Sequence, residues 1–191
     1  MVAIAEARDR GELPAEICLV ISDVEGAPIL QKAAQRGIPA VYVPPGPYSA
    51  KLDETAEQKM LEALKEHGAQ WIALAGFMRI LKGAFLRAFP DRIVNIHPSL
   101  LPAFPGLRAW RQAMDYGAQM TGCTVHLVDR GIDTGTILAQ AAAPILPEDT
   151  EESLLERIHQ QEWALYPKTI AQWIQGEYRI QGRRALRRTQ D

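Results

Sequence analysis

The segment RIVNIHPSLLPAFPG, residues 92–106, is the best starting point for interpreting the chain. Its first half predicts a buried strand over 93–97, and strand side chains alternate between two faces, so Asn95 and His97 share a face. Pro98 ends the strand because it cannot donate a ladder hydrogen bond. An amide and an imidazole at the carboxyl end of a strand lie where α/β sheets bind ligands. We therefore expect catalysis here, with hydrogen bonding to loop backbone as the alternative role.

On either side of this segment, short apolar runs alternate with helical patterns, which is typical of an α/β fold with a parallel sheet covered by helices. The predicted strands are 17–22, 40–43, 71–75, 93–97, 123–128 and 136–143, and the predicted helices are 28–36, 52–66, 82–88, 107–116 and 150–175. Asp149 and Glu152 form a capping-box pattern for the last helix, and Gly176 is a natural stop. We predict one domain over 1–180, followed by a basic C-terminal tail, 181–191.

Composition narrows the functional classes. The 191 residues are 47% hydrophobic with a net charge of −2, which is ordinary for a soluble protein and excludes polyanion binding by bulk charge. The basic run near the C-terminus reads as a solvated tail, with a nucleic-acid arm as the alternative. No secretion signal or run of roughly 18 apolar residues occurs, so we expect a cytoplasmic protein without membrane or nucleic-acid partners. Cys18 and Cys123 lie in apolar runs that predict buried strands with reduced thiols.

A second cluster occurs in TGCTVHLVDRGIDTGTIL, residues 121–138. His126 lies inside a predicted strand, and Asp133 lies in the following loop between Gly131 and Gly135. These glycines allow positive φ angles and a close approach to a ligand. An aspartate beside His97 would stabilise the imidazolium, although a turn role for Asp133 is the alternative. No metal-ligand spacing is present, so we expect no metal.

Two further features are candidates. Glu162 falls in the middle of an apolar stripe on the last predicted helix, so it should be paired or functional unless it reaches the helix edge. The segment LAGFMRIL, residues 74–81, runs off the end of a strand. Its apolar side chains could pack in the core, or could wall a flat aromatic ligand with Arg79 supplying a charge.

Four stretches resemble the phosphoribosylglycinamide formyltransferase family: LAGFMRIL, NIHPSLLPAFPGLRAWRQA, TGCTVHLVD with GIDTGTIL, and QEWALYP. The resemblance extends over residues 1–178. Methionyl-tRNA formyltransferase and formyl-tetrahydrofolate hydrolase share the N-x-H…D pattern, but FPGLRAWRQA is more similar to the first family. The resemblance implies a seven-stranded, mostly parallel Rossmann-like sheet. It also implies formyl transfer from 10-formyltetrahydrofolate to the amine of the small-molecule substrate glycinamide ribonucleotide in purine biosynthesis. We expect a monomer or a weak homodimer.

The resemblance also implies roles for individual residues. Asn95, His97 and Asp133 match a catalytic trio for direct transfer, in which Asn95 and His97 stabilise the tetrahedral intermediate and Asp133 assists. The positions that match folate-binding residues are Met78, Arg79, Ile80, Leu81, Asn95, Asp129 and Asp133, with Lys51 as a looser match. The positions that match the ribonucleotide site are Gly76, Pro98 and Glu162.

The chain departs from this family at its start. The family begins with a strand and a glycine-rich loop that holds the substrate phosphate at a helix N-terminus. Here Met1 falls at the beginning of the helical pattern VAIAEARDRG. We therefore expect an absent strand in the middle of the sheet, from a misplaced start or a shortened chain, and weak ribonucleotide binding. The alternatives are a fold that begins on a helix, a binding or scaffold protein without activity, and a formyltransferase for tRNA-bound or nucleotide-sugar amines.

Overall fold

The structure, a computed structural model, describes residues 1–81 and 83–188. Its strands are β1 (Val20–Ser22), β2 (Ala40–Tyr42), β3 (Ile72–Leu74), β4 (Ile93–His97), β5 (Met120–Leu127), β6 (Ile137–Pro144), β7 (Tyr178–Gln181) and β8 (Arg184–Arg187). Its helices are α1 (Val2–Asp9), α2 (Pro28–Ala34), α3 (Glu54–Glu66), α4 (Gly83–Ala88), α5 (Ala109–Tyr116) and α6 (Glu151–Ile174). Lys82 of the predicted helix 82–88 and residues 189–191 of the predicted tail lie outside the described residues.

The α/β class is confirmed, and the strand directions are mixed. A two-stranded sheet has the order β1-β2, and a six-stranded sheet has the order β3-β4-β5-β6-β8-β7. The pairs β1–β2, β3–β4 and β6–β8 are parallel, whereas β4–β5, β5–β6 and β7–β8 are antiparallel. A short loop over residues 128–136 joins β5 to β6 directly, and a connection of that length links only antiparallel neighbours.

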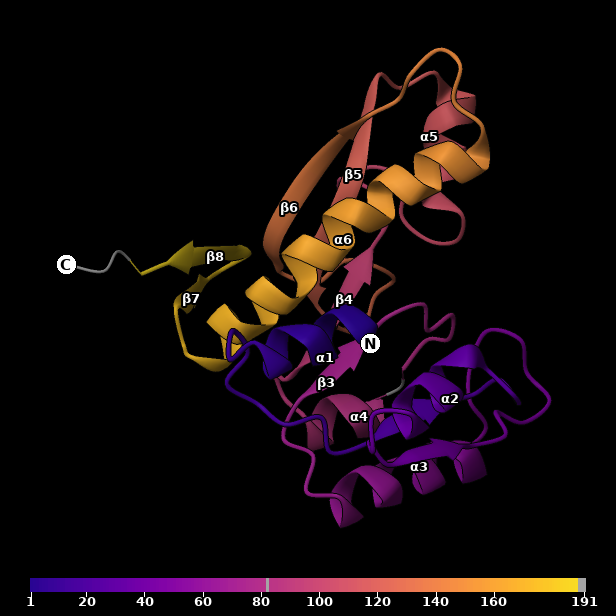
Figure 1. Ribbon diagram of the computed structural model, residues 1–191, viewed down its shortest axis with the longest axis vertical. Helices are drawn as coiled ribbons and strands as arrows, with labels where there is room; N and C mark the ends of the chain where they lie inside the picture. Colours follow the sequence, from indigo (N-terminus) through magenta and orange to yellow (C-terminus); the bar gives the residue numbers. More distant parts are fainter. Residues whose placement is uncertain (82, 189–191) are drawn as a thin grey trace.

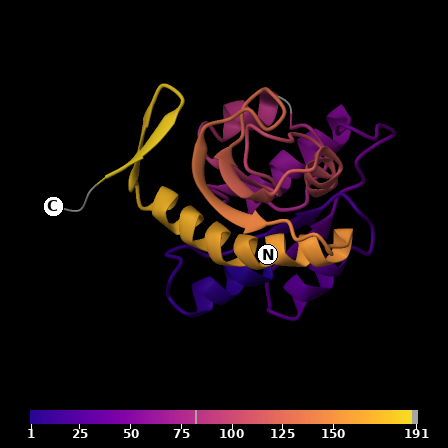
Figure 2. The ribbon, with the colours of Figure 1, turned by 90° about the horizontal axis from the view of Figure 1, so that it is seen from above.

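Helices cover both faces of the larger sheet, as Figures 1 and 2 show for α6, which runs across one face. Val94 and Ile96 pack on that side in a core with Leu154 and Ile158 of α6. Ile93 belongs to the opposite core, together with residues of α3 and α4. The predicted alternation along β4 is therefore confirmed, and Asn95 and His97 follow Ile93 onto the face away from α6.

The sheet is divided between β1 and β3. Both are edge strands in the described part of the chain, and both line a cavity of about 480 Å³. The C-terminal end of α6 closes one side of this cavity through Ile170, Trp173 and Ile174. The seven-stranded sheet implied by the resemblance is therefore not continuous. The division lies between the parallel pairs β1–β2 and β3–β4.

The predicted ends of α6 are partly confirmed. The capping box uses Thr150 and Ser153, one residue beyond the expected Asp149 and Glu152. The physical reason is that the Asp149 carboxylate accepts the Leu146 amide at 2.7 Å and pairs with Arg157, so it cannot also cap the helix. At the other end, Gly176 follows the last turn with a φ of 72°, as a stop residue should.

The C-terminal segment contains a β-hairpin that the sequence patterns did not predict. β7 and β8 pair across a turn at Gly182, and β8 extends the sheet beside β6 through the pair Ile137 and Arg184. Figures 1 and 2 show the hairpin projecting from the body of the molecule. Arg183, expected in a solvated tail, donates to the Thr134 carbonyl at 2.9 Å.

The cysteines differ in their surroundings. Cys123 is buried in β5, where burial raises the pKa of its thiol to about 12, so it is an inert thiol. Cys18 is also a free thiol, but it precedes β1 and is half-buried, so its predicted place in a buried strand is wrong. Within the described residues, no helix combines the length and apolar character needed to cross a membrane.

Candidate active site

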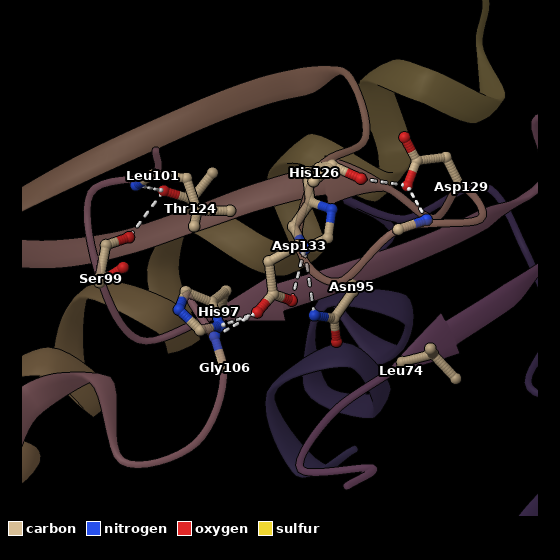
Figure 3. A network of polar contacts seen from close by, with 12 residues as sticks. Leu74, Asn95, His97, Ser99, Leu101, Gly106, Thr124, His126, Asp129 and Asp133 are labelled. Carbon is tan, nitrogen blue, oxygen red and sulfur yellow. Dashed lines mark hydrogen bonds and ion pairs between the residues drawn. The ribbon is translucent and has the colours of Figure 1, made fainter. Parts of the chain in front are cut away.

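The amide of Asn95 is held in place by His126 on the neighbouring strand, its register partner in the β4–β5 ladder. His126 Nδ1 donates to the Leu127 carbonyl at 2.8 Å, so its Nε2 can accept the Asn95 amide at 3.1 Å. Burial lowers the pKa of His126, which keeps the ring neutral and its Nε2 an acceptor. Figure 3 shows the two side chains pointing toward each other from adjacent strands. One N–H of Asn95 is thereby used and the other is left for a ligand.

His97 and Asp133 lie together, as the sequence predicts. His97 Nδ1 is 3.4 Å from Asp133 Oδ2, and both side chains are almost covered (Figure 3). The same carboxylate oxygen accepts the Gly106 amide at 2.8 Å, which holds it in place. Asp133 Oδ1 is also 3.6 Å from His126 Nε2, but a neutral ring forms no ion pair there. Asp133 is therefore the carboxylate that faces His97.

Asp133 reaches His97 by a different route from the one expected. We expect the two residues at the ends of neighbouring strands. Instead β5 is antiparallel to β4, and its end lies beside the start of β4, where the Val128 amide donates to the Ile93 carbonyl at 2.9 Å. The loop that follows must therefore fold back along the sheet to place Asp133 beside His97.

The glycines in this loop serve a purpose other than the predicted one. Gly131 and Gly135 are not among the positive-φ residues, whereas Asp133 itself has a φ of 53°. A Cβ at Gly135 would lie 1.7 Å from the Leu127 carbonyl oxygen, and one at Gly131 would lie 2.0 Å from the Thr134 hydroxyl. These glycines are needed for close packing of the loop against the chain itself, and the prediction of positive φ at both is wrong.

The loop after β4 is tied to β5 by Thr124, the register partner of His97. The Thr124 hydroxyl donates to the Ser99 carbonyl at 2.7 Å and accepts the Leu101 amide at 3.0 Å. Further along this loop, the Phe104 carbonyl accepts from His97 Nε2 at 2.9 Å. Both ring nitrogens of His97 therefore face oxygen atoms, and these contacts fix the orientation of the ring.

The segment 76–81 follows the carboxyl end of β3, which lies beside Asn95 on β4. Leu74 at the end of β3 is the register partner of Asn95, and Gly76 with a φ of 69° starts the loop. Met78 is 61% exposed and Ile80 44%, which is the exposed apolar surface that a flat ligand would need. Leu81 is buried and belongs to the core.

The cations near this loop differ in accessibility. Lys51 is exposed and forms a β-bridge with Ile80, and its ammonium lies 4.4 Å from the centre of the Tyr48 ring. Arg79 instead pairs with Asp23 at 2.5 Å, and its side chain is 15% exposed. The expectation that Arg79 presents its charge to a ligand is therefore not supported by its contacts.

Asp129 shapes the loop that carries Asp133. Its Oδ1 accepts the Gly131 amide at 3.0 Å and the Thr134 hydroxyl at 2.7 Å. Pro98 lies directly after β4, next to His97. Among the described residues, no group of three His, Cys, Asp or Glu side chains is arranged to hold a metal ion.

A profile of the family described as "Formyl transferase" matches residues 1–170, most of the chain. The chain belongs to the formyl transferase family. A curated relative is phosphoribosylglycinamide formyltransferase of Bacillus subtilis, 42% identical over 84% of this chain and 81% of its own. The trifunctional purine biosynthetic protein adenosine-3 of Drosophila melanogaster is 44% identical over 85% of this chain, but the match spans only 12% of that longer protein.

Solved structures agree with this family assignment. Glycinamide ribonucleotide transformylase 1 of Symbiobacterium toebii superposes with a TM-score of 0.91 at 43% identity. The superposition covers 97% of this formyl transferase and 86% of that chain. The fold described above is therefore the fold of the family.

Glu162 of this formyl transferase belongs to α6, on the other side of β4 from the face that carries Asn95 and His97. Burial and then the charge of Glu162 raise the pKa of Cys123 and Tyr166, both in the core on the α6 side. Burial raises the pKa of Glu162 itself to about 7, and His159 Nε2 is 4.0 Å away. A carboxyl group with this pKa can exchange a proton near neutral pH.

Two residues of this formyl transferase have roles that the sequence patterns did not assign. His126 orients Asn95, and Thr124 ties down the loop that contacts His97. Both are polar residues at alternating positions in the second half of β5, on the face shared with Asn95 and His97. That alternation in TVHLV is the signal that could have identified them.

Proposed function

We propose that this chain transfers the formyl group of 10-formyltetrahydrofolate to the primary amine of glycinamide ribonucleotide, a step of purine biosynthesis. The observation that carries the proposal is that Asn95, His97 and Asp133 lie together at the carboxyl end of β4. The distance between His97 Nδ1 and Asp133 Oδ2 is 3.4 Å. The relatives support the choice of acceptor, because those that match over most of their length are named for it.

Asn95 is proposed to stabilise the oxyanion that develops on the formyl oxygen. The donor supplies an electrophilic formyl carbon, to which the acceptor amine adds. One Asn95 N–H donates to His126, which holds the amide so that its second N–H can donate to that oxygen. A fixed donor of this kind is worth about 3–4 kcal/mol in the transition state.

His97 and Asp133 are proposed to supply the second donor and to guide the proton. Asp133 faces His97 Nδ1 and so orients the ring. To reach the formyl oxygen, His97 exchanges its hydrogen bond to the Phe104 carbonyl for one to the substrate. Asp133 also orders a water molecule that carries the amine proton to the departing folate nitrogen. No metal is required for these steps.

The donor is proposed to lie between two loops. Met78, Ile80 and the backbone of Arg79 and Leu81 form one wall, with Lys51 at its edge. The loop from Asp129 to Asp133 forms the other wall. Gly76, Pro98 and Glu162 are proposed to contact the ribonucleotide; Gly76 and Pro98 follow the ends of β3 and β4, and Glu162 lies on α6.

The test is formyl transfer by the purified chain supplied with 10-formyltetrahydrofolate and glycinamide ribonucleotide. We expect formylglycinamide ribonucleotide and tetrahydrofolate in equal amounts. Parallel reactions with charged initiator tRNA, and with no acceptor, measure the rival tRNA activity and simple hydrolysis. Release of formate at the same rate with and without the ribonucleotide would contradict the proposal.

A further inference from the structure

Arg79 connects the two sheets across their division. It belongs to the loop that follows β3 of the six-stranded sheet, whereas Asp23 directly follows β1 of the two-stranded sheet. Arg79 Nε donates to Asp23 Oδ2 at 2.5 Å, and the two side chains are 15% and 13% exposed. This pair is therefore largely shielded from water, unlike most surface ion pairs.

The same guanidinium also holds the segment that follows β2. Arg79 Nη1 donates to the carbonyl oxygens of Tyr48 and Ser49. The next residue, Ile80, donates its backbone amide to the Ala50 carbonyl at 3.0 Å. The chain segments that leave β1, β2 and β3 therefore meet at one arginine.

A contact of this kind is strong enough to decide the shape of a loop. Hydrogen bonds between ionised partners are roughly twice as strong as neutral ones, and shielding from water reduces their screening. Removing one partner leaves the other charge without compensation in a poorly hydrated place, which is costly. The loop has a fixed conformation as long as Asp23 compensates Arg79.

We propose that Asp23 is a positioning residue for the formyl-donor site. Its carboxylate holds Arg79, and Arg79 holds residues 76–81 so that Met78 and Ile80 stay exposed toward the donor. This inference rests on the proposed function, because it assumes that the loop binds the folate. In this inference Arg79 has a structural role, whereas the sequence suggests that its charge contacts the ligand.

The main test is steady-state kinetics of Asp23→Ala. We expect KM for 10-formyltetrahydrofolate to rise about tenfold, the equivalent of about 1.4 kcal/mol, with kcat and KM for the amine substrate within about twofold of wild type. If Arg79 instead binds the donor with its own charge, releasing it from Asp23 would leave this KM unchanged or lower it. That result would overturn the inference.

A double-mutant cycle shows whether Asp23 acts through Arg79. Arg79→Ala should raise the donor KM by a similar factor, and adding Asp23→Ala to it should change nothing further. Asp23→Asn keeps an oxygen that can accept from Arg79 Nε, so it should restore most of the wild-type KM. Independent, additive effects of the two alanine substitutions would contradict the proposal.

Arg157→Gln is the matched control. It breaks an ion pair of similar length, 2.6 Å to Asp149, beside the start of α6. We expect it to lower the melting temperature without changing the donor KM. If both Arg157→Gln and Asp23→Ala raise the donor KM equally, the effect reflects general destabilisation and the inference fails.

Hydrogen exchange separates this inference from the proposed function. Asp23→Ala should speed exchange of the Ile80 amide, whose acceptor lies across the division, while the amides of β5 keep their protection. If the wild-type chain does not bind 5-formyltetrahydrofolate as a probe, the proposed function is wrong, and the exchange result alone then decides the role of Asp23. Unchanged exchange at Ile80 would refute that role.

Discussion

The two halves of α6 lie on very different parts of the molecule. Near its start, Leu154 and Ile158 are fully buried against the continuous part of the larger sheet. Near its end, Ile170, Trp173 and Ile174 line the cavity between β1 and β3. Tyr166 lies between these halves and donates to the carbonyl oxygens of Leu74 and Val94, which joins the helix to both β3 and β4.

The residues proposed for catalysis lie in the continuous part of the larger sheet, whereas the loop proposed to bind the donor lies beside the division. Asn95, His97 and His126 are on strands that pair with a neighbouring strand on each side. The loop 76–81 follows an edge strand and is held to the other sheet by the contacts of Arg79 and Ile80. We therefore expect substitutions on β4 and β5 to change the rate, and substitutions beside the division to change binding or have small effects on stability.

The largest effect is expected for Asn95→Ala. It removes the proposed oxyanion donor from the rigid part of the sheet, so kcat should fall about 10²–10³-fold. The measurement is kcat with both substrates saturating, and thermal unfolding serves as the control for folding. Near-normal turnover in a folded variant would rule out the oxyanion role.

Two leucine-to-alanine substitutions compare how much each core contributes to the free energy of unfolding. Leu154→Ala should lower the free energy of unfolding by about 3 kcal/mol, because its site is fully enclosed and leaves a cavity. Leu64→Ala should cost about half as much, since Leu64 already borders the cavity between the sheets. Urea titrations of both variants give the two values. Equal losses would show that the division is as well packed as the rest.

Glu162 lies midway along α6. The pH dependence of stability that it causes tests whether water reaches the junction between the two halves of the helix. Its pKa is raised from 4.5 to about 7, so the native state keeps a proton that the unfolded state has lost between these values. Stability should therefore fall as the pH rises from about 4.5 to 7, by up to about 3 kcal/mol. Glu162→Gln should remove this slope and be the more stable protein at pH 8. A slope that is the same in both proteins would mean that Glu162 is hydrated.

The smallest effect is expected at the start of α6. Thr150→Ala removes the side chain that accepts the Ser153 amide, and loss of such a cap costs about 1 kcal/mol. This cost is local, so it should leave the donor KM unchanged. A shift of the denaturation midpoint without a change in KM is the expected result, and a raised donor KM would show that strain at this end of α6 reaches the donor loop.

Much of the site could be predicted from the sequence because it depends on local patterns. The bounds of β4 and the shared face of Asn95 and His97 follow from alternation and from Pro98. The proximity of Asp133 to His97 was also predicted, although for a reason that the antiparallel course of β5 makes wrong. The hairpin of β7 and β8 was missed because each strand has only four residues, and because its place beside β6 depends on a contact far away in the chain.

The sequence by itself determined the order of the elements up to α6, the family of formyl transferases, and the residue types available at the carboxyl end of β4. Periodicity and motifs carry that information because they depend on residues that are close together in the chain. Only the tertiary structure decided that Asp23 holds Arg79 and that His126 orients Asn95. These features depend on pairs of residues far apart in the chain, and on how much water is left between them, which no local pattern encodes.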